Sequence, residues 1–226
     1  MNFEFQRVTN DVFTYAEVNG MIQSIDENKD NLGFGIRNFL ENNPRVLNRI
    51  SKTAEFLELV KTHFKRPRII KSIYFDKPKK ANWVVNWHQD ITVNLSRKLD
   101  RNGYSNWRVL KDRVVVQPPE QLLRSILTYR IHLDDTTELN GALKVILCSE
   151  DQGIMRLDKN YINSTCNEVE VCNDGRGGVL TMSPLTVHAS QRSMDSQKRR
   201  RVIHLEVIEV AGNIEDLPWR ENYALC

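Results

Sequence analysis

Cysteine is scarce in this 226-residue chain, and no long apolar segment interrupts its polar composition. No two cysteines have Cys-x-x-Cys spacing, which argues against a structural zinc site and against a disulfide framework. No stretch is apolar enough for a membrane span, and charged residues near the start argue against a signal peptide. These features predict a cytoplasmic protein with reduced thiols and no membrane partner. The cysteines are Cys148, Cys166, Cys172 and Cys226, and the early charged residues are Glu4, Arg7 and Asp11.

The chain also lacks a large excess of either charge. It has 32 Lys and Arg residues and 29 Asp and Glu residues, which gives a formal net charge of +3. Basic clusters occur at 65–68, 77–80 and 198–201, and the first two are typical of solvated edges. A dedicated nucleic-acid-binding protein would concentrate a larger basic excess on one face. We therefore expect a small-molecule partner and no nucleic acid.

The first 66 residues are predicted to be mostly helical. Apolar residues recur at helical spacing over 15–27 and again over 36–40. Asn43 and Pro44 then suit an N-cap and a first helical position, and a broad apolar stripe continues from there to Phe64. Such a stripe is typical of a packing face, so these helices are expected to lie against a sheet.

Residues 67–211 change to short β-branched and aromatic segments separated by turns. Many short strands after a helical front predict a mainly β fold, a sandwich or jelly roll with N-terminal helices. We expect a single domain over 1–226, with 1–66 as helical support, 67–211 as the β core and 212–226 as a tail. The expected strands cover 69–75, 83–94, 114–116, 125–133, 142–147, 169–172, 178–182, 185–189 and 202–210, with a turn at 173–175 joining two of them.

A polar segment at 96–111 contains Gly103, Tyr104 and Trp107. Long loops in compact domains are often functional, so this segment is a candidate lid over a site. The alternative for Trp107 is packing on the exterior of the barrel.

The stretch 82–90 ends in His88 and Asp90, which we expect on one strand. Side chains two residues apart on an extended backbone point to the same face, so an imidazole and a carboxylate would project together. These are two of the three ligands of a 2-His-1-carboxylate site for Fe(II). The alternative is that Asp90 is a turn residue at the end of a strand.

A second histidine that could complete this set is His188, which shares a strand face with Ser190. A lone histidine on a strand is often a hydrogen-bonded core residue. However, the arginine run 199–201 follows about a dozen residues later and opens another strand. An arginine fork there could hold a carboxylate in two hydrogen bonds. Two imidazoles, a carboxylate and this guanidinium suit Fe(II) with a 2-oxo acid cosubstrate.

Read in order, the motifs of the chain from Gly35 onward resemble the phytanoyl-CoA dioxygenase family, in particular its short bacterial-type members. The motifs are IRNFL (36–40), FDK (75–77), ANWVVNWHQD (81–90), VQPP (116–119), RIHLDD (130–135), NGAL (140–143), VHAS (187–190) and RRVIHLE (200–206). The resemblance implies a double-stranded β-helix, a cupin-like jelly roll. It also implies Fe(II), 2-oxoglutarate as cosubstrate, and O₂.

By position, the resemblance implies that His88, Asp90 and His188 ligate the iron. Arg200 would bind 2-oxoglutarate with help from Ser190, and Arg130 would border the cosubstrate. Arg199 lies at the family's more usual distance from the second histidine and is the alternative to Arg200. The implied reaction is hydroxylation of a C–H bond in a small metabolite, with release of succinate and CO₂. A His/Asp/His zinc hydrolase and a non-enzymatic barrel that binds a small acid are the competing interpretations.

Overall fold

The computed structural model describes residues 6–28, 34–77, 83–164, 168–194 and 198–225. Cys166 and Cys226, and the motif residues 81 and 82, lie outside the described residues. Cys148 is exposed and Cys172 is buried. No helix in the described ranges is long and apolar enough to cross a membrane.

The larger of the main sheets has seven antiparallel strands and forms one wall of the fold. Its central strand β13 pairs along its length with β3 on one side and with β8 on the other. In order across the sheet the strands are β1 (Gln6–Thr9), β11 (Val179–Met182), β8 (Ile126–His132), β13 (Arg200–Glu209), β3 (Pro67–Lys77) and β14 (Tyr223–Ala224), with β2 (Gly35–Arg37) also paired to β3.

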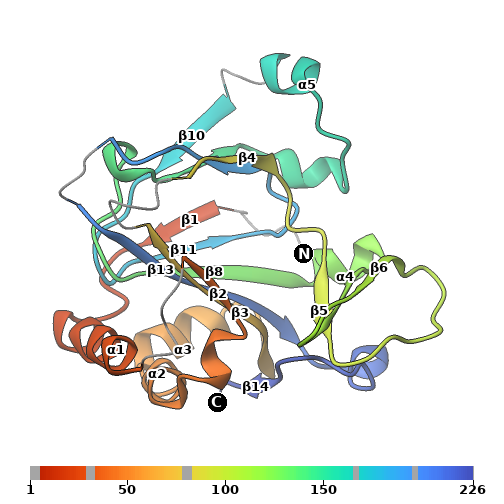
Figure 1. The fold of residues 1–226 in the computed structure, drawn as a ribbon, viewed down its shortest axis with the longest axis horizontal. Helices are drawn as coiled ribbons and strands as arrows, with labels where there is room; N and C mark the ends of the chain where they lie inside the picture. The colour runs from red at the N-terminus through yellow and green to blue at the C-terminus, as the bar shows by residue number, and fades with distance from the viewer. Residues whose placement is uncertain (1–5, 29–33, 78–82, 165–167, 195–197, 226) are drawn as a thin grey trace.

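A four-stranded sheet faces this wall across the interior (Figure 1). Its order is β10 (Val169–Cys172), β9 (Leu143–Ile146), β12 (His188–Ser190) and β4 (Val85–His88). A third, three-stranded sheet is formed by β5 (Val93–Leu95), β7 (Val114–Gln117) and β6 (Ser105–Val109). Two facing antiparallel sheets confirm the predicted mainly β jelly roll.

Three helices cover the outer face of the larger sheet (Figure 1). They are α1 (Tyr15–Glu27), α2 (Pro44–Ile50) and α3 (Ala54–Lys61). Thr14 caps α1 in a capping box with Glu17, which satisfies free backbone N–H groups at its start. The helices bury Met21 and Phe56 in one core cluster with Tyr74 and Tyr129 of the sheet. The short helices are α4 (Glu120–Arg124), α5 (Lys159–Ser164), η2 (Phe39–Glu41), η3 (Glu138–Asn140), η4 (Ser149–Gln152) and η6 (Gly212–Ile214).

Two helical predictions were wrong in detail. Residues 36–40 form the end of β2 and a 3₁₀ turn, because Asn38 adopts a left-handed conformation with φ of 52° and breaks any continuous helix. The stripe from Pro44 to Phe64 is split at Ser51–Thr53 into α2 and α3. The apolar spacing runs through the break, so periodicity alone did not reveal it.

Two strand predictions also need correction. The segment 83–94 is divided between β4 and β5, which belong to different sheets. The turn at 173–175 does not close a hairpin, because β10 pairs with β9 while β11 pairs with β8. This turn instead carries the chain from the four-stranded sheet to the larger one.

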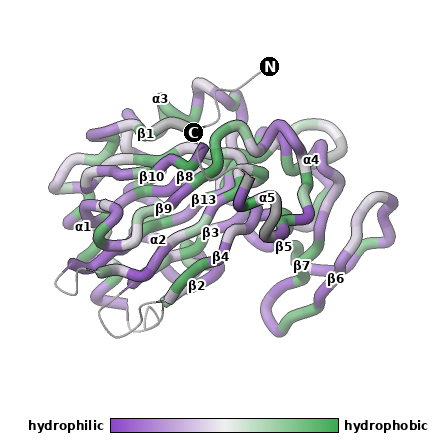
Figure 2. The backbone as a smooth tube through the Cα atoms, turned by 90° about the horizontal axis from the view of Figure 1, so that it is seen from above, coloured by the Kyte–Doolittle hydropathy of each residue, from purple (hydrophilic) through white to green (hydrophobic). Residues whose placement is uncertain are grey.

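The candidate lid at 96–111 contains strand β6, which pairs with β7 in a hairpin that projects from the body of the molecule (Figure 2). Trp107 stacks on Tyr104 at 6.1 Å between ring centroids and packs against a core cluster that includes Leu95 and Leu217. Trp107 is not among the described residues that line the cavity beside His88, which favours the packing interpretation of Trp107, and the lid role of the segment stays a prediction.

Gly177 connects the helical layer to the sheets at a point where a side chain has no room. Its φ is +88°, and an added Cβ would lie 2.1 Å from the carbonyl oxygen of Phe13. We expect Gly177→Ala to lower the free energy of unfolding by about 2 kcal/mol or more, because the left-handed conformation and the backbone clash both add cost. Urea unfolding measures this. Gly175→Ala is the matched control, since nothing lies within 4 Å of a Cβ there, and equal losses in the two variants would contradict the prediction.

Candidate metal centre and cosubstrate pocket

His88 and His188 are directly opposite each other on the paired strands β4 and β12, with ring centroids 4.2 Å apart. Nδ1 of His88 lies 2.8 Å from the carbonyl oxygen of Asn86, and Nδ1 of His188 lies 2.8 Å from that of Thr186. A carbonyl only accepts, so each Nδ1 carries the proton and donates it. Both Nε2 atoms are therefore left with a lone pair for a metal ion.

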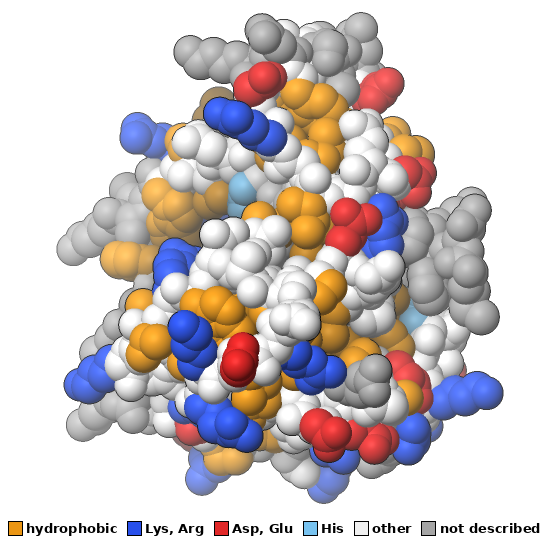
Figure 3. All heavy atoms as spheres, turned by 90° about the vertical axis from the view of Figure 1, so that its right-hand side faces the viewer, with side chains coloured by type: hydrophobic (Ala, Val, Ile, Leu, Met, Phe, Trp, Pro, Cys, Tyr) orange, Lys and Arg blue, Asp and Glu red, His pale blue; other side chains and the backbone are white. Residues whose placement is uncertain are grey.

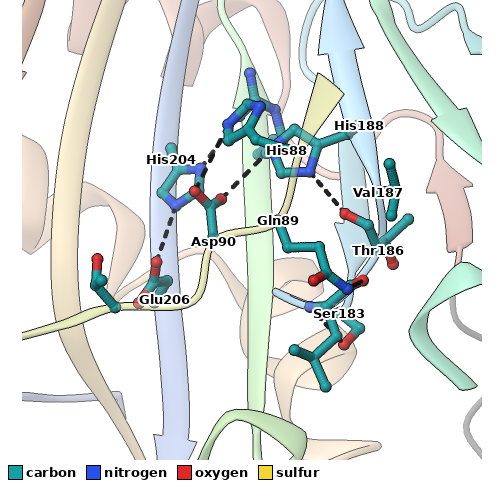
Figure 4. A network of polar contacts seen from close by, with 12 residues as sticks. His88, Gln89, Asp90, Ser183, Thr186, Val187, His188, His204 and Glu206 are labelled. Atoms are coloured by element: carbon teal, nitrogen blue, oxygen red, sulfur yellow. Dashed lines mark hydrogen bonds and ion pairs between the residues drawn. The ribbon is translucent and has the colours of Figure 1, made fainter. Parts of the chain in front are cut away.

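Asp90 brings a carboxylate to the same point (Figure 4). Its Oδ1 lies 3.9 Å from Nε2 of His88, and its Oδ2 lies 3.6 Å from Nε2 of His188. One donor atom from each residue lies within 4.8 Å of the others, so a single ion can contact all three. Two imidazoles and a carboxylate on one side of an ion form the facial set that Fe(II) oxygenases use.

The prediction that His88 and Asp90 share a strand was wrong, although the two side chains do meet. Strand β4 ends at His88, and Asp90 lies in the irregular segment that follows. The backbone N–H of Asp90 donates to the carbonyl of Pro184 over 2.8 Å. This bond attaches the segment to the turn before β12 and so fixes Asp90 relative to His188.

Gln89, between the two ligands, anchors this segment through three hydrogen bonds that sequence reasoning missed. Its Nε2 donates to the carbonyls of Gly153 and Leu185 over 2.8 and 2.6 Å, and its Oε1 accepts from the N–H of Met155 over 2.9 Å. The side chain thereby holds a non-strand backbone in one conformation (Figure 4). A polar residue between two candidate ligands is the signal that could have suggested this role.

The electrostatics of the triad favour the protonation states that bind metals. Burial acts to raise the pKa of Asp90, but His188, His204 and Lys71 more than offset it and hold that pKa well below its usual value. Burial lowers the pKa of His188 to about 4, against the opposing effect of Asp90. Near neutral pH the site therefore presents an ionised carboxylate and a neutral imidazole, which are the forms that coordinate metal ions.

A second cluster behind Asp90 contains His204 and Glu206, which also come within metal-binding distance of it. Arg130 Nη1 lies 3.1 Å from Nδ1 of His204, so that nitrogen accepts and Nε2 carries the proton. Nε2 of His204 lies 3.5 Å from Glu206, which is in turn ion-paired with the buried Lys71. Both residues are thus engaged by the buried cations Arg130 and Lys71, and we interpret this cluster as support for Asp90.

The triad opens onto a cavity of about 270 Å³ whose far end is cationic. Arg200, Arg130 and Lys77 line it together with Ser190. Arg200 is 4% exposed and makes no ion pair within the described part of the chain. Its burial, and then Arg130, lower the pKa of Arg200 to about 9. A buried guanidinium without a counter-charge is costly, so this end of the cavity fits an anion.

The arginine run alternates as the pleat of β13 requires. Arg199 pairs with Asp76 and Arg201 pairs with Asp134, whereas Arg200 between them lines the cavity. The geometry therefore favours Arg200 over Arg199 as the residue available to a cosubstrate. Arg130 also lines the cavity, where it is held by His204 and lies over the ring of Phe75 at 5.5 Å.

Lys77 is a further cation at this end that sequence reasoning missed. It is directly opposite Arg200 on the neighbouring strand, and its Nζ donates to Oγ of Ser190 over 2.9 Å and to the carbonyl of Gln191 over 3.1 Å. Burial, then Arg200 and Arg130, lower the pKa of Lys77 to about 7. Lys77 follows the predicted strand 69–75 in the FDK motif, and this position was the sequence signal that could have suggested it.

Comparison with known proteins agrees with this site. The family model described as phytanoyl-CoA dioxygenase (PhyH) matches residues 23–202. The chain belongs to the phytanoyl-CoA dioxygenase family. Its cofactors are those of Fe(II)- and 2-oxoglutarate-dependent oxygenases, namely Fe(II), 2-oxoglutarate and O₂. No curated protein matches the chain in sequence.

Several solved structures share the fold at low sequence identity. EctD from S. alaskensis, solved with 2-oxoglutarate and 5-hydroxyectoine, has 15% identity and a TM-score of 0.66 over 92% of this chain and 73% of its own. HygX from Streptomyces hygroscopicus, solved with nickel, 2-oxoglutarate and hygromycin B, has 13% identity and a TM-score of 0.65 over 98% and 94%. The epimerase SnoN from nogalamycin biosynthesis has 11% identity and a TM-score of 0.63 over 91% and 78%. At sequence identities this low, the structural similarity shows that the fold is shared and no more.

The anchoring of Gln89 generates a prediction about the metal. We expect Gln89→Leu to weaken Fe(II) binding by about 10- to 100-fold, because the side chain keeps its size but loses the bonds that fix the segment between the ligands. Anaerobic titration of the metal-free protein with Fe(II) measures this. Gln23→Leu, on the exposed side of α1, is the control. Wild-type affinity in the Gln89 variant would show that the segment is held by other contacts.

Proposed function

We propose that this oxygenase hydroxylates a C–H bond of a small-molecule metabolite and converts 2-oxoglutarate to succinate and CO₂. One observation carries the proposal: Nε2 of His88, Nε2 of His188 and a carboxylate oxygen of Asp90 converge, and a buried arginine without a counter-charge lies in the same cavity. Such a pair of sites fits a metal ion and an anionic cosubstrate bound side by side.

In this proposal His88, Asp90 and His188 hold Fe(II), and the iron supplies the binding of O₂ and the oxidative chemistry when it is present. Arg200 holds the distal carboxylate of 2-oxoglutarate by a two-pronged hydrogen bond. Lys77 keeps the hydroxyl of Ser190 in place beside it and adds positive charge when protonated. An arriving carboxylate favours that protonated form, because it supplies the counter-charge that the apolar surroundings lack.

The remaining lining residues keep water from the reacting groups. Ile73, Phe75, Trp83 and Leu143 form apolar walls between the two sheets. Apolar walls of this kind limit the access of water to the bound substrate and so direct the oxidation to it. The cationic end also favours an oxygenase over the alternative zinc hydrolase, because hydrolysis requires no clamp for a second carboxylate.

The first test is formation of the Fe(II)·2-oxoglutarate complex. We expect the anaerobic protein with Fe(II) and 2-oxoglutarate to develop a weak visible charge-transfer band, and the aerobic protein to form succinate. His188→Ala should abolish both, because it removes one of three metal ligands. Circular dichroism checks that this variant folds. Tight zinc binding without the band would support the hydrolase, and a band or succinate in the variant would remove His188 from the site.

The second test separates the neighbouring arginines. We expect Arg200→Gln to weaken 2-oxoglutarate binding by about 30-fold or more, because it removes the buried partner of a carboxylate. Arg199→Gln is the matched control and should change binding by less than about threefold, since Arg199 is half-exposed, is paired with Asp76, and is not among the described residues that line the cavity. Titration of the charge-transfer band gives both affinities. A larger loss in the Arg199 variant would reverse the assignment.

A further inference from the structure

A fourth cation, Arg37, lines the cavity from the edge strand β2. It pairs in register with Ile73 of β3, whereas Arg200 pairs with Lys77 four residues further along the same strand. Four residues of β-strand span about 13 Å. The backbone position of Arg37 is therefore well separated from the cosubstrate end, so the two ends of the cavity each have their own cation.

The chain provides Arg37 with no partner in the parts that the structure describes. The acid beside it, Asp112, is already bound by Arg113 at 2.7 Å and by the amide of Asn38 at 3.0 Å. The charged groups that act on the Arg37 guanidinium are Arg113, Asp112 and Asp90. Arg37 is exposed, and it also lines the cavity that contains the candidate metal ligand Asp90, so it can bind a ligand that enters the cavity from solvent.

The charges around the cavity leave room for one more anion. Fe(II) and the 2-oxoglutarate dianion cancel each other, and Asp90 is the single carboxylate among the lining residues described. Arg37, Arg130 and Arg200 outweigh it even when Lys77 is neutral. On the face drawn in Figure 3, by contrast, basic and acidic side chains are interspersed. Compared with that face, the cavity carries an excess of positive charge.

We propose that the oxidised substrate carries an oxyanion, a carboxylate or a phosphate, which Arg37 binds while a C–H bond of the same molecule lies over the metal centre. This inference rests on the proposed oxygenase function. A guanidinium suits the role because its planar fork matches either oxyanion in two parallel hydrogen bonds. The left-handed turn at Asn38, whose amide bonds to Asp112, fixes the end of β2 and with it the base of the arginine.

The experiment uses the full chain with Fe(II), excess 2-oxoglutarate and O₂. A cell metabolite extract is divided by anion-exchange resin into a retained and an unretained fraction. The readout is CO₂ released from 2-oxoglutarate labelled in its C1 carboxylate, divided by the release without extract. Mass spectrometry of the extract identifies the compound that gains one oxygen. We expect the retained fraction alone to stimulate release, and phosphatase treatment of that fraction distinguishes a phosphate from a carboxylate.

Variants connect this response to Arg37. We expect Arg37→Gln to require at least about tenfold more of the retained fraction for half-maximal stimulation, and Arg37→Lys, which keeps the charge but not the fork, to lie between it and wild type. Arg108→Gln, exposed on β6, is the control and should behave as wild type. Stimulation by the unretained fraction, no response to the retained one, or a wild-type response of Arg37→Gln would each overturn the proposal. Absence of both labelled CO₂ and the charge-transfer band would instead show that the oxygenase function has failed.

Discussion

The antiparallel pairing of β12 with β4 is the interaction on which the site depends, because it sets His188 directly opposite His88. Backbone carbonyls on the same two strands take the Nδ1 protons, so the sheet also determines which nitrogen of each ring faces the metal. A shift of one residue in this register would turn one histidine to the other face of the sheet. The third candidate ligand, Asp90, then needs only a short irregular segment to reach the pair.

The seven-stranded sheet contributes buried positive charge to the cavity, and this charge lowers the stability of the folded protein when no ligand is bound. Arg200, Arg130 and Lys77 are buried near one another, and their proximity adds to burial in lowering the pKa values of Arg200 and Lys77. Natural proteins retain such costs where a ligand removes them. An anion that binds the folded state stabilises it in proportion to the logarithm of its concentration over its dissociation constant. The binding of 2-oxoglutarate and the stability of the barrel are therefore linked.

Much of the fold and part of the candidate site could be predicted from the sequence, because both rest on strand alternation. The helix at 15–27 follows from helical spacing, and the succession of short strands predicted the jelly roll. Arg200 was implied by the family resemblance, and the alternation along β13 agrees with it. The rest depended on long-range contacts that spacing does not encode. Asp90 reaches the site from outside a strand, and Gln89 acts through backbone groups more than sixty residues away.

Arg37 and Lys77 were missed for a related reason, since their roles arise from which strands become neighbours. The same strand pairing also makes the two ends of the cavity differ in charge. The inward face of β13 presents Arg200, then His204, then Glu206, and Lys71 neutralises the last of these. Three cations, Arg200, Arg130 and Lys77, therefore gather at one end of the cavity, and Arg37 on the edge strand is separate from them in the strand register. A dianionic cosubstrate is drawn to one end, and the edge strand leaves the second cation for a different molecule.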